Sequence, residues 1–70
     1  MHRFFVPKEQ IENDSVRIVG SDVNHIKNVL RLKPGDKIAV FDSAQNVYTC
    51  EINEFNREFI RGTVVSREKD

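Results

Sequence analysis

Short stretches in which apolar and polar residues alternate run through the chain, and this pattern predicts half-buried β-strands. Residues 15–19 are the clearest example, with Val16 and Ile18 on one face and Arg17 on the other. Gly20 ends this run. Because successive side chains of a strand point to opposite faces, Val16 and Ile18 are predicted to lie in the core.

Four further stretches have strand character: residues 2–6, 36–42, 47–55 and 58–66. Pro7 ends the first of them, since proline has no N–H group to donate to a sheet. Gly62 interrupts the last one and indicates a bulge or a barrel corner. The alternation puts Ile38 and Val40 on one face of their strand and Tyr48, Cys50 and Ile52 on the core-facing side of the next. The last strand supplies the apolar residues Phe59, Ile60, Val64 and Val65.

A helical period appears between the second and third of these strands. Four apolar residues recur there at helical spacing and fall on one side of a helix: Val23, Ile26, Val29 and Leu30. Ser21 is a suitable N-cap residue, and Pro34 with Gly35 breaks the pattern. The sequence therefore predicts a helix of about ten residues that does not extend past Lys33.

These elements predict a mainly β protein, a small β-barrel of five to six strands with one short α-helix between the second and third strands. Closure of the sheet would remove edges that invite aggregation. A chain of 70 residues has room for one domain. We expect a single domain over residues 1–70, in which residues 66–70 begin a linker.

The formal net charge is zero, so only the distribution of charged residues along the chain can indicate a charged partner. Residues 27–37 carry four basic side chains and one acidic one, a local net charge of +3. The polar side of the helix presents Asn24, Lys27, Asn28 and Arg31, which suit RNA phosphates and hydrogen bonding. The alternative is a solvated amphipathic helix whose lysines only maintain solubility.

Residues near the start of the chain extend this reading. His2 and Arg3 lie beside Phe4 and Phe5, and exposed aromatic rings stack on unpaired bases while arginine holds phosphate. At least one of the two phenylalanines must nevertheless face the core of so small a domain.

The remaining reactive side chains indicate no catalytic centre. Asp42 with Glu51 is a conceivable carboxylate pair, but acids at strand ends usually cap turns. His2 and His25 are the only histidines, too few for a zinc site, and the single cysteine, Cys50, alternates with core residues. We expect no catalytic residue, no metal and no cofactor in this chain.

The cysteine count and the hydropathy pattern bear on the compartment. One cysteine excludes an internal disulfide, which is typical of reducing surroundings. No apolar run has the length of a membrane span, and the first residues lack the apolar stretch of a signal peptide. A cytoplasmic protein without a membrane partner is predicted.

Three segments resemble a known family: the opening HRFFV, the block HIKNVLRLKPGDKIAVFD over residues 25–42, and the following YTCEI. Together they are similar to the N-terminal PUA-like domain of the RsmE family, bacterial methyltransferases that modify N3 of a uridine in small-subunit ribosomal RNA. Many members have glycine where this chain has Ser43, so a different hairpin turn is expected there.

The resemblance implies a division of labour. The family's knotted SPOUT domain, which binds S-adenosylmethionine and transfers the methyl group, is absent from these residues. The PUA-like domain would grip RNA through Arg3, His25, Asn28 and Arg31, with Lys27 and Lys33 on phosphates. The implied partners are small-subunit ribosomal RNA and the chain's own catalytic domain, and a second copy in a homodimer is a further option. The alternative is a structural module that docks the catalytic domain or mediates dimerisation without strong RNA binding.

Overall fold

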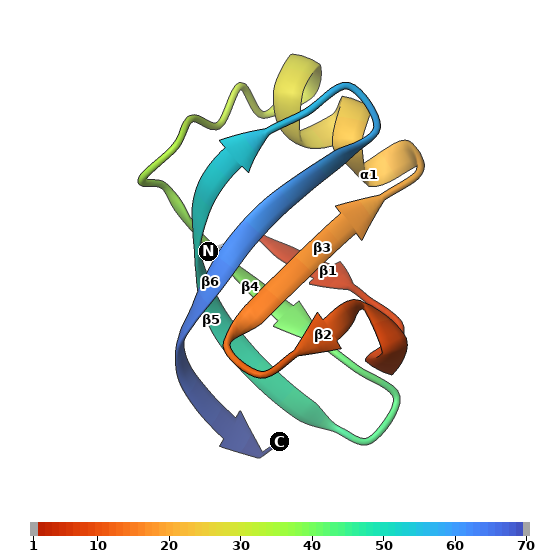
Figure 1. Ribbon diagram of the computed structural model, residues 1–70, viewed down its shortest axis with the longest axis vertical. Helices are drawn as coiled ribbons and strands as arrows, with labels where there is room; N and C mark the ends of the chain where they lie inside the picture. The colour runs from red at the N-terminus through yellow and green to blue at the C-terminus, as the bar shows by residue number, and fades with distance from the viewer. Residues whose placement is uncertain (1, 70) are drawn as a thin grey trace.

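The computed structural model describes residues 2–69, which form one curled sheet closed at one end by a short helix (Figure 1). The six strands follow the spatial order β1-β4-β5-β6-β3-β2. Their bounds are β1 (Arg3–Phe5), β2 (Ile11–Glu12), β3 (Ser15–Val19), β4 (Lys37–Phe41), β5 (Asn46–Phe55) and β6 (Phe59–Lys69). The prediction of a mainly β, barrel-like fold is confirmed.

The helical segment lies between the third and fourth strands, so its predicted place between the second and third was wrong. The reason is β2, which has only two residues and therefore shows no alternation. It pairs with β3 through Ile11 opposite Val16, and Asn13 in the intervening turn has φ 55°. The 3-10 turn η1 (Lys8–Gln10) connects β1 to β2.

The helix is nine residues long but is not a regular α-helix. It begins as α1 (Ser21–Asn24) and continues as the π-helical segment η2 (His25–Val29). Gly20, with φ 79°, is the N-cap residue, so the predicted cap at Ser21 was wrong. The Leu30 amide donates to the His25 carbonyl at 2.9 Å, five residues back.

The wider π turn changes which side chains reach the core. Val23 and Ile26 are buried as predicted, whereas Val29 is 61% exposed. A π-helix advances less per residue around its axis than an α-helix, so Val29 falls outside the predicted apolar stripe. Arg31 then leaves the helix with φ 55°.

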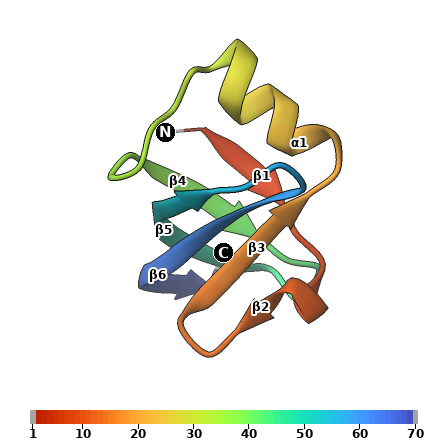
Figure 2. The same cartoon turned by 45° about the horizontal axis from the view of Figure 1, so that its top comes forward.

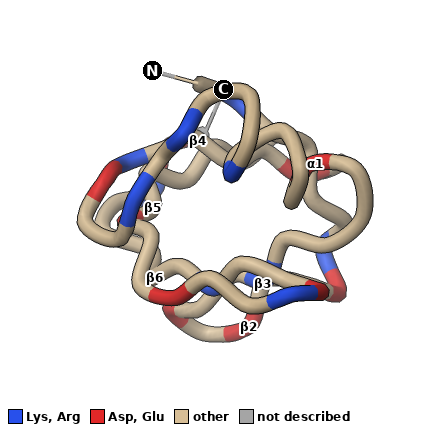
Figure 3. Tube along the Cα trace, turned by 90° about the horizontal axis from the view of Figure 1, so that it is seen from above, with Lys and Arg blue, Asp and Glu red and all other residues tan. Residues whose placement is uncertain are grey.

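The core fills the inside of the curled sheet and is covered at one end by the helical segment. Viewed from above, the chain trace surrounds this interior (Figure 3). Its members are Phe4, Val6, Val16, Ile18, Val23, Ile26, Ile38, Val40, Cys50, Ile52, Ile60 and Val64. Cys50 and Ile52 are among them as predicted, whereas Tyr48, predicted for the same face, is half-buried.

Gly62 lies where three strands approach one another closely. It is opposite Val16 of β3 and Ile52 of β5. A Cβ atom there would stand 3.1 Å from the Glu51 carbonyl oxygen and 3.3 Å from Val16 Cγ1. The β5–β6 register shifts next to this point, between Ile52 and Glu54, so the irregularity predicted from the glycine is present.

The last strand is longer than predicted. β6 runs to Lys69, and Arg67 and Glu68 pair with Tyr48 and Val47 of β5. Residues 67–69 are therefore strand rather than linker, and Asp70 lies outside the described residues. The mixed charges of these residues suggested a linker. The exposed end of a strand can have the same composition, so the composition did not distinguish the two.

Candidate nucleic-acid interface

The helix lies across one end of the barrel (Figure 2). Most of its predicted polar side is turned to solvent. Asn24, Asn28 and Arg31 are exposed. The Asn28 side-chain amide donates to the Asn24 side-chain oxygen at 2.5 Å, one turn away. This bond aligns the two amides along the helix. The polar side predicted from the spacing is thus solvent-facing, although Lys27 departs from it.

Lys27 is half-buried and engaged with the β5–β6 turn. Its Nζ atom donates to the backbone carbonyl of Asn56 at 3.1 Å. The two residues are 29 positions apart, so nothing in the sequence indicated this contact. Lys27 therefore fastens the helix to the turn, and only part of its hydrogen-bonding capacity is open to another partner.

His25 stands between the helix surface and the first strand. Its exposed ring meets the ring of Phe4 edge to face, with centroids 6.2 Å apart. Phe4 is 6% exposed and Phe5 is 50% exposed. Phe4 is accordingly a core residue rather than a stacking platform, which fulfils the expectation that one of the two phenylalanines faces inward.

The loop that leaves the helix is pinned to β5. The Lys33 amide donates to the Asp36 carboxylate at 2.7 Å. The Gly35 amide donates to the Ile52 carbonyl at 2.7 Å, and the Ile52 amide donates to the Asp36 carbonyl at 2.8 Å. Lys33 itself is exposed. Its backbone is thus fixed while its ammonium group stays in solvent.

Arg3 occupies a separate place on the barrel. It lines a pocket of about 220 Å³ together with Phe41, Asp42, Gln45 and Val47. Alternation along β1 puts Arg3 and Phe5 on the outer face, opposite the buried Phe4. The helix residues do not line this pocket.

Asp42 organises the β4–β5 turn and is 5% exposed. Its carboxylate accepts hydrogen bonds from the Ala44 amide (2.9 Å), the Asn46 amide (3.0 Å) and the Tyr48 hydroxyl (3.1 Å). Burial tends to raise the pKa of Asp42, but the hydrogen bonds from Asn46, Tyr48 and Ala44 together hold that pKa below its ordinary value. Asp42 is a turn-capping acid.

The candidate reactive groups are not assembled into a catalytic site. Glu51 is opposite Lys37 at one end of the β4–β5 pair, while Asp42 follows Phe41 at the other end. Burial raises the pKa of the Cys50 thiol to about 11, which disfavours its reactive thiolate.

Within residues 2–69 no three His, Cys, Asp or Glu side chains are grouped as metal ligands. The same residues form no helix that is long and apolar enough to cross a membrane.

Another cationic cluster lies on the outer face of β3 and β6 and was not predicted. Arg17 and Arg61 are directly opposite each other in the strand register. Their guanidinium carbons stand 4.7 Å and 5.6 Å from the centre of the Phe59 ring. The alternation of residues 15–19 placed Arg17 outside, but the strand pairing that brings Arg61 opposite it could not be read from the sequence.

The comparisons with known proteins address the family directly. Residues 18–65 match the family model described as the RNA methyltransferase PUA domain. The chain belongs to this family. The matched residues include the HIKNVLRLKPGDKIAVFD block, on which the resemblance to a PUA-like domain of an RNA methyltransferase was based. The predicted family is confirmed.

Solved structures with the same fold come from longer chains. A predicted RNA methyltransferase from Thermotoga maritima is 26% identical, with a TM-score of 0.87 over 100% of this PUA domain and 31% of that chain. A hypothetical protein is 28% identical (TM-score 0.86; 99% and 30% covered). The ribosomal RNA small subunit methyltransferase E from Neisseria gonorrhoeae, solved with S-adenosyl methionine, is 23% identical (TM-score 0.80; 100% and 28% covered). The PUA domain thus spans about 30% of the chains it matches.

Proposed function

We propose that this PUA domain binds and positions RNA for an S-adenosylmethionine-dependent methyltransferase that modifies uridine N3 in small-subunit ribosomal RNA. The observation that carries the proposal is the solvent-facing polar side of α1 and η2 on a domain of the RNA methyltransferase PUA family. Asn28 lies on that side, Arg31 is exposed just past the end of the helix, and Lys33 follows in the loop that is bonded to β5.

The chemistry of this surface suits single-stranded RNA. Arg31 and Lys33 supply exposed cationic donors for phosphate oxygens, and Arg31 has the planar fork that fits them. Asn28 and His25 have donors and acceptors that match the edges of unpaired bases. Lys27 contributes a cation at the edge of the surface while its bond to Asn56 keeps the helix in place.

Basic and acidic residues are spread around the whole barrel rather than segregated onto two halves (Figure 3). Because the formal net charge is zero, the electrostatic field of the whole domain does not attract RNA over a long range. Affinity has to come from local contacts at the helix and its exit loop. Modest affinity with a clear dependence on salt follows from a small number of phosphate contacts.

Methyl transfer is assigned to the part of the longer relatives that this domain does not span. The gonococcal relative was solved with S-adenosyl methionine, and the PUA domain matches 28% of that chain. We place the cofactor on a SPOUT catalytic domain and the protein in the cytoplasm, with ribosomal RNA and that domain as partners. A homodimer would bring two such RNA surfaces into one assembly.

Fluorescence anisotropy with a labelled fragment of small-subunit ribosomal RNA, at two salt concentrations, tests the proposal. Arg31→Glu should weaken binding by about tenfold, within the range measured for charge-assisted contacts. The matched control is Lys8→Glu on η1, a charge reversal at an exposed residue outside the helix surface. Equal affinities for the two folded variants would reject the helix as the RNA surface.

A second candidate function is docking of the catalytic domain, and the outer face of β1 favours it. Phe5 is half exposed, and its ring meets Phe41 edge to face with centroids 5.6 Å apart. The occupant we assign is the catalytic domain, because the matched relatives have about 70% of their chains outside the region that this domain covers. Calorimetric titration with that domain should show binding that Phe5→Ser removes. A dimer detected by light scattering without the catalytic domain would instead identify a second copy as the occupant.

A further inference from the structure

Arg17 and Arg61 form a like-charged pair that the fold itself does not require. They are directly opposite each other on the exposed face of β3 and β6, and like charges in this arrangement destabilise a sheet. Among the described residues, Arg61 pairs with Glu54 at 3.8 Å, and Arg17 is in no ion pair. The single ion pair to Glu54 leaves most of this positive charge unneutralised, so the two arginines can attract an anion.

Phe59 holds the two guanidinium groups in place. Arg17 and Arg61 both lie over its half-buried ring, at 4.7 Å and 5.6 Å from the ring centre. Such cation–π contacts fix the plane of a guanidinium while leaving its N–H edge free to donate. The pair is therefore preorganised, which lowers the entropy cost of binding an anion.

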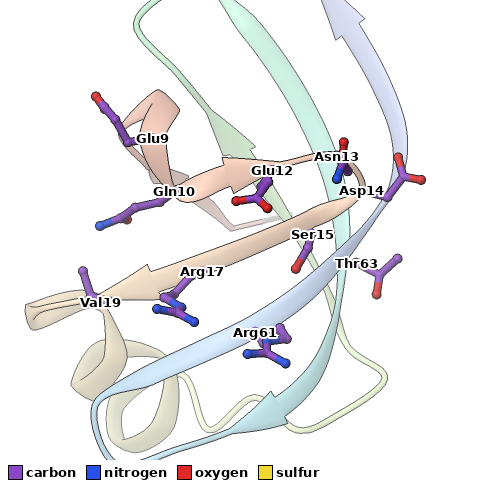
Figure 4. Close-up of a pocket in the computed structure, with 10 residues that line it drawn as sticks. All are labelled: Glu9, Gln10, Glu12, Asn13, Asp14, Ser15, Arg17, Val19, Arg61 and Thr63. Carbon is purple, nitrogen blue, oxygen red and sulfur yellow. The ribbon is translucent and has the colours of Figure 1, made fainter.

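The pair stands at one end of a concave surface of about 780 Å³. Figure 4 shows the two guanidinium groups close together over β3 and β6, with the acidic side chains nearer β2 and η1. Of these acids, Asp14 is neutralised by Arg67 at 2.8 Å, while Glu9 and Glu12 remain. The carboxylates of Glu9 and Glu12 repel an anion, so an anion is expected to bind at the end of the concave surface that the two arginines line.

We propose that Arg17 and Arg61 bind one phosphate group of an RNA strand whose neighbouring nucleotides contact the helix. Two guanidinium forks can donate several charge-assisted hydrogen bonds to the oxygens of one phosphate. The inference rests on the proposed RNA-binding function and adds a contact to it. Because two guanidinium groups already lie over the Phe59 ring, the site suits phosphate better than a stacked base.

The position of the site supports a continuous path from the helix. Phe59 follows the β5–β6 turn, and Asn56 of that turn accepts the hydrogen bond from Lys27. Val19, opposite Phe59, leads directly through Gly20 into α1. The arginine pair and the polar side of the helix therefore adjoin the same turn, and one strand passing over it can reach both.

The test is an NMR titration that observes the side-chain N–H groups of arginine. The full chain is titrated with inorganic phosphate, with a short single-stranded RNA, and with sodium chloride as the ionic-strength control. Phosphate and RNA should both shift the Arg17 and Arg61 signals, and chloride should not. Signals that move with phosphate but not with RNA would mean that the site takes a free anion, which overturns the proposal.

RNA affinity of variants completes the test. Arg17→Gln should weaken RNA binding by about tenfold at low salt and reduce the salt slope by about one. Arg17→Lys should recover only part of this loss, because lysine keeps the charge without the fork. The matched control is Lys8→Gln, which removes one exposed charge from η1.

The outcomes separate this inference from the proposed function. Unchanged affinity in Arg17→Gln, together with weakened binding in Arg31→Glu, overturns the arginine site and leaves the helix surface intact. Loss in both variants supports both. RNA binding that neither substitution weakens overturns both, as does failure of the folded chain to bind RNA.

Discussion

The ammonium group of Lys27 donates to the backbone carbonyl of Asn56 at 3.1 Å, joining the helix to the β5–β6 turn. The helix would otherwise rest on the barrel mainly through Val23 and Ile26. A segment with only two fully buried side chains has little to hold its orientation. The lysine contact therefore helps to fix how the polar side of the helix is presented.

Replacing Lys27 should affect stability, unlike replacing its exposed neighbours. Lys27→Ala removes the bond to Asn56 and should lower the free energy of unfolding by roughly 1 kcal/mol, the typical net contribution of one hydrogen bond, because solvent screens this exposed contact. Lys33→Ala, which removes an exposed ammonium group from the loop after the helix, is the control and should change it by less. Urea denaturation measures both, and equal effects would show that the lysine contact carries no stability.

Arg31 combines a proposed RNA contact with a strained backbone. Its φ of 55° places a residue with a Cβ atom in the left-handed region. Arg31→Gly should therefore raise the free energy of unfolding by about 0.5–1 kcal/mol while weakening RNA binding. Thermal denaturation and RNA anisotropy on the same samples check this. A variant that is less stable than the parent would show that the arginine side chain stabilises the fold.

Local patterns predicted the strands well because each strand carries its own alternation. Val16, Ile18, Ile38 and Val40 are buried as their positions required. The two-residue β2 has no such pattern and is held by its pairing with β3. The π turn was also invisible, because Val29 satisfies α-helical spacing and only the hydrogen bond from Leu30 to His25 reveals the wider turn.

The candidate sites depended on contacts between distant residues to different degrees. The polar side of the helix follows from spacing within one element: Asn24 and Asn28 are exposed as the spacing predicted, whereas Lys27 is bonded to Asn56 and Arg31 lies past the end of the helix. The arginine pair depends on the β3–β6 register, which sets Arg17 opposite Arg61 and is decided by the whole sheet. Arg3 stays a predicted RNA contact; it lies on the exposed face of β1 and lines a pocket with Phe41 and Asp42.

Asp42 should make the fold sensitive to acid. Its pKa is lower in the folded state than its ordinary value of 3.8, so folding favours the carboxylate. The stability it supplies is complete above about pH 4 and is lost as the pH falls through the lowered pKa. Asp42→Asn should be less stable than the parent at pH 7, with a gap that narrows below pH 4. Denaturation at several pH values measures this gap, and a gap independent of pH would contradict the assignment.

Gly62 is expected to resist substitution for reasons of space. In Gly62→Ala the new Cβ meets the Glu51 carbonyl oxygen and Val16, and we expect a loss of roughly 1–3 kcal/mol, as for overpacked cores. Gly20→Ala is the matched control, because Gly20 has φ 79° and open space around it. Its cost should be about 1–2 kcal/mol from the backbone alone. Val16→Ala should rescue Gly62→Ala in part and should not rescue Gly20→Ala.

Cys50 provides a separate test of how tightly the barrel core is closed. Burial raises its pKa from 9.0 to about 11, so the folded state favours the neutral thiol. The stability that this supplies is complete below the unfolded pKa near 9 and is lost as the pH rises towards 11. At pH 8, iodoacetamide should alkylate Cys50 only during opening of the core, so urea should accelerate labelling in step with unfolding. Rapid labelling of the folded chain without urea would instead show a solvent-accessible thiolate and would contradict the buried position of Cys50 against Ile38 and Val64.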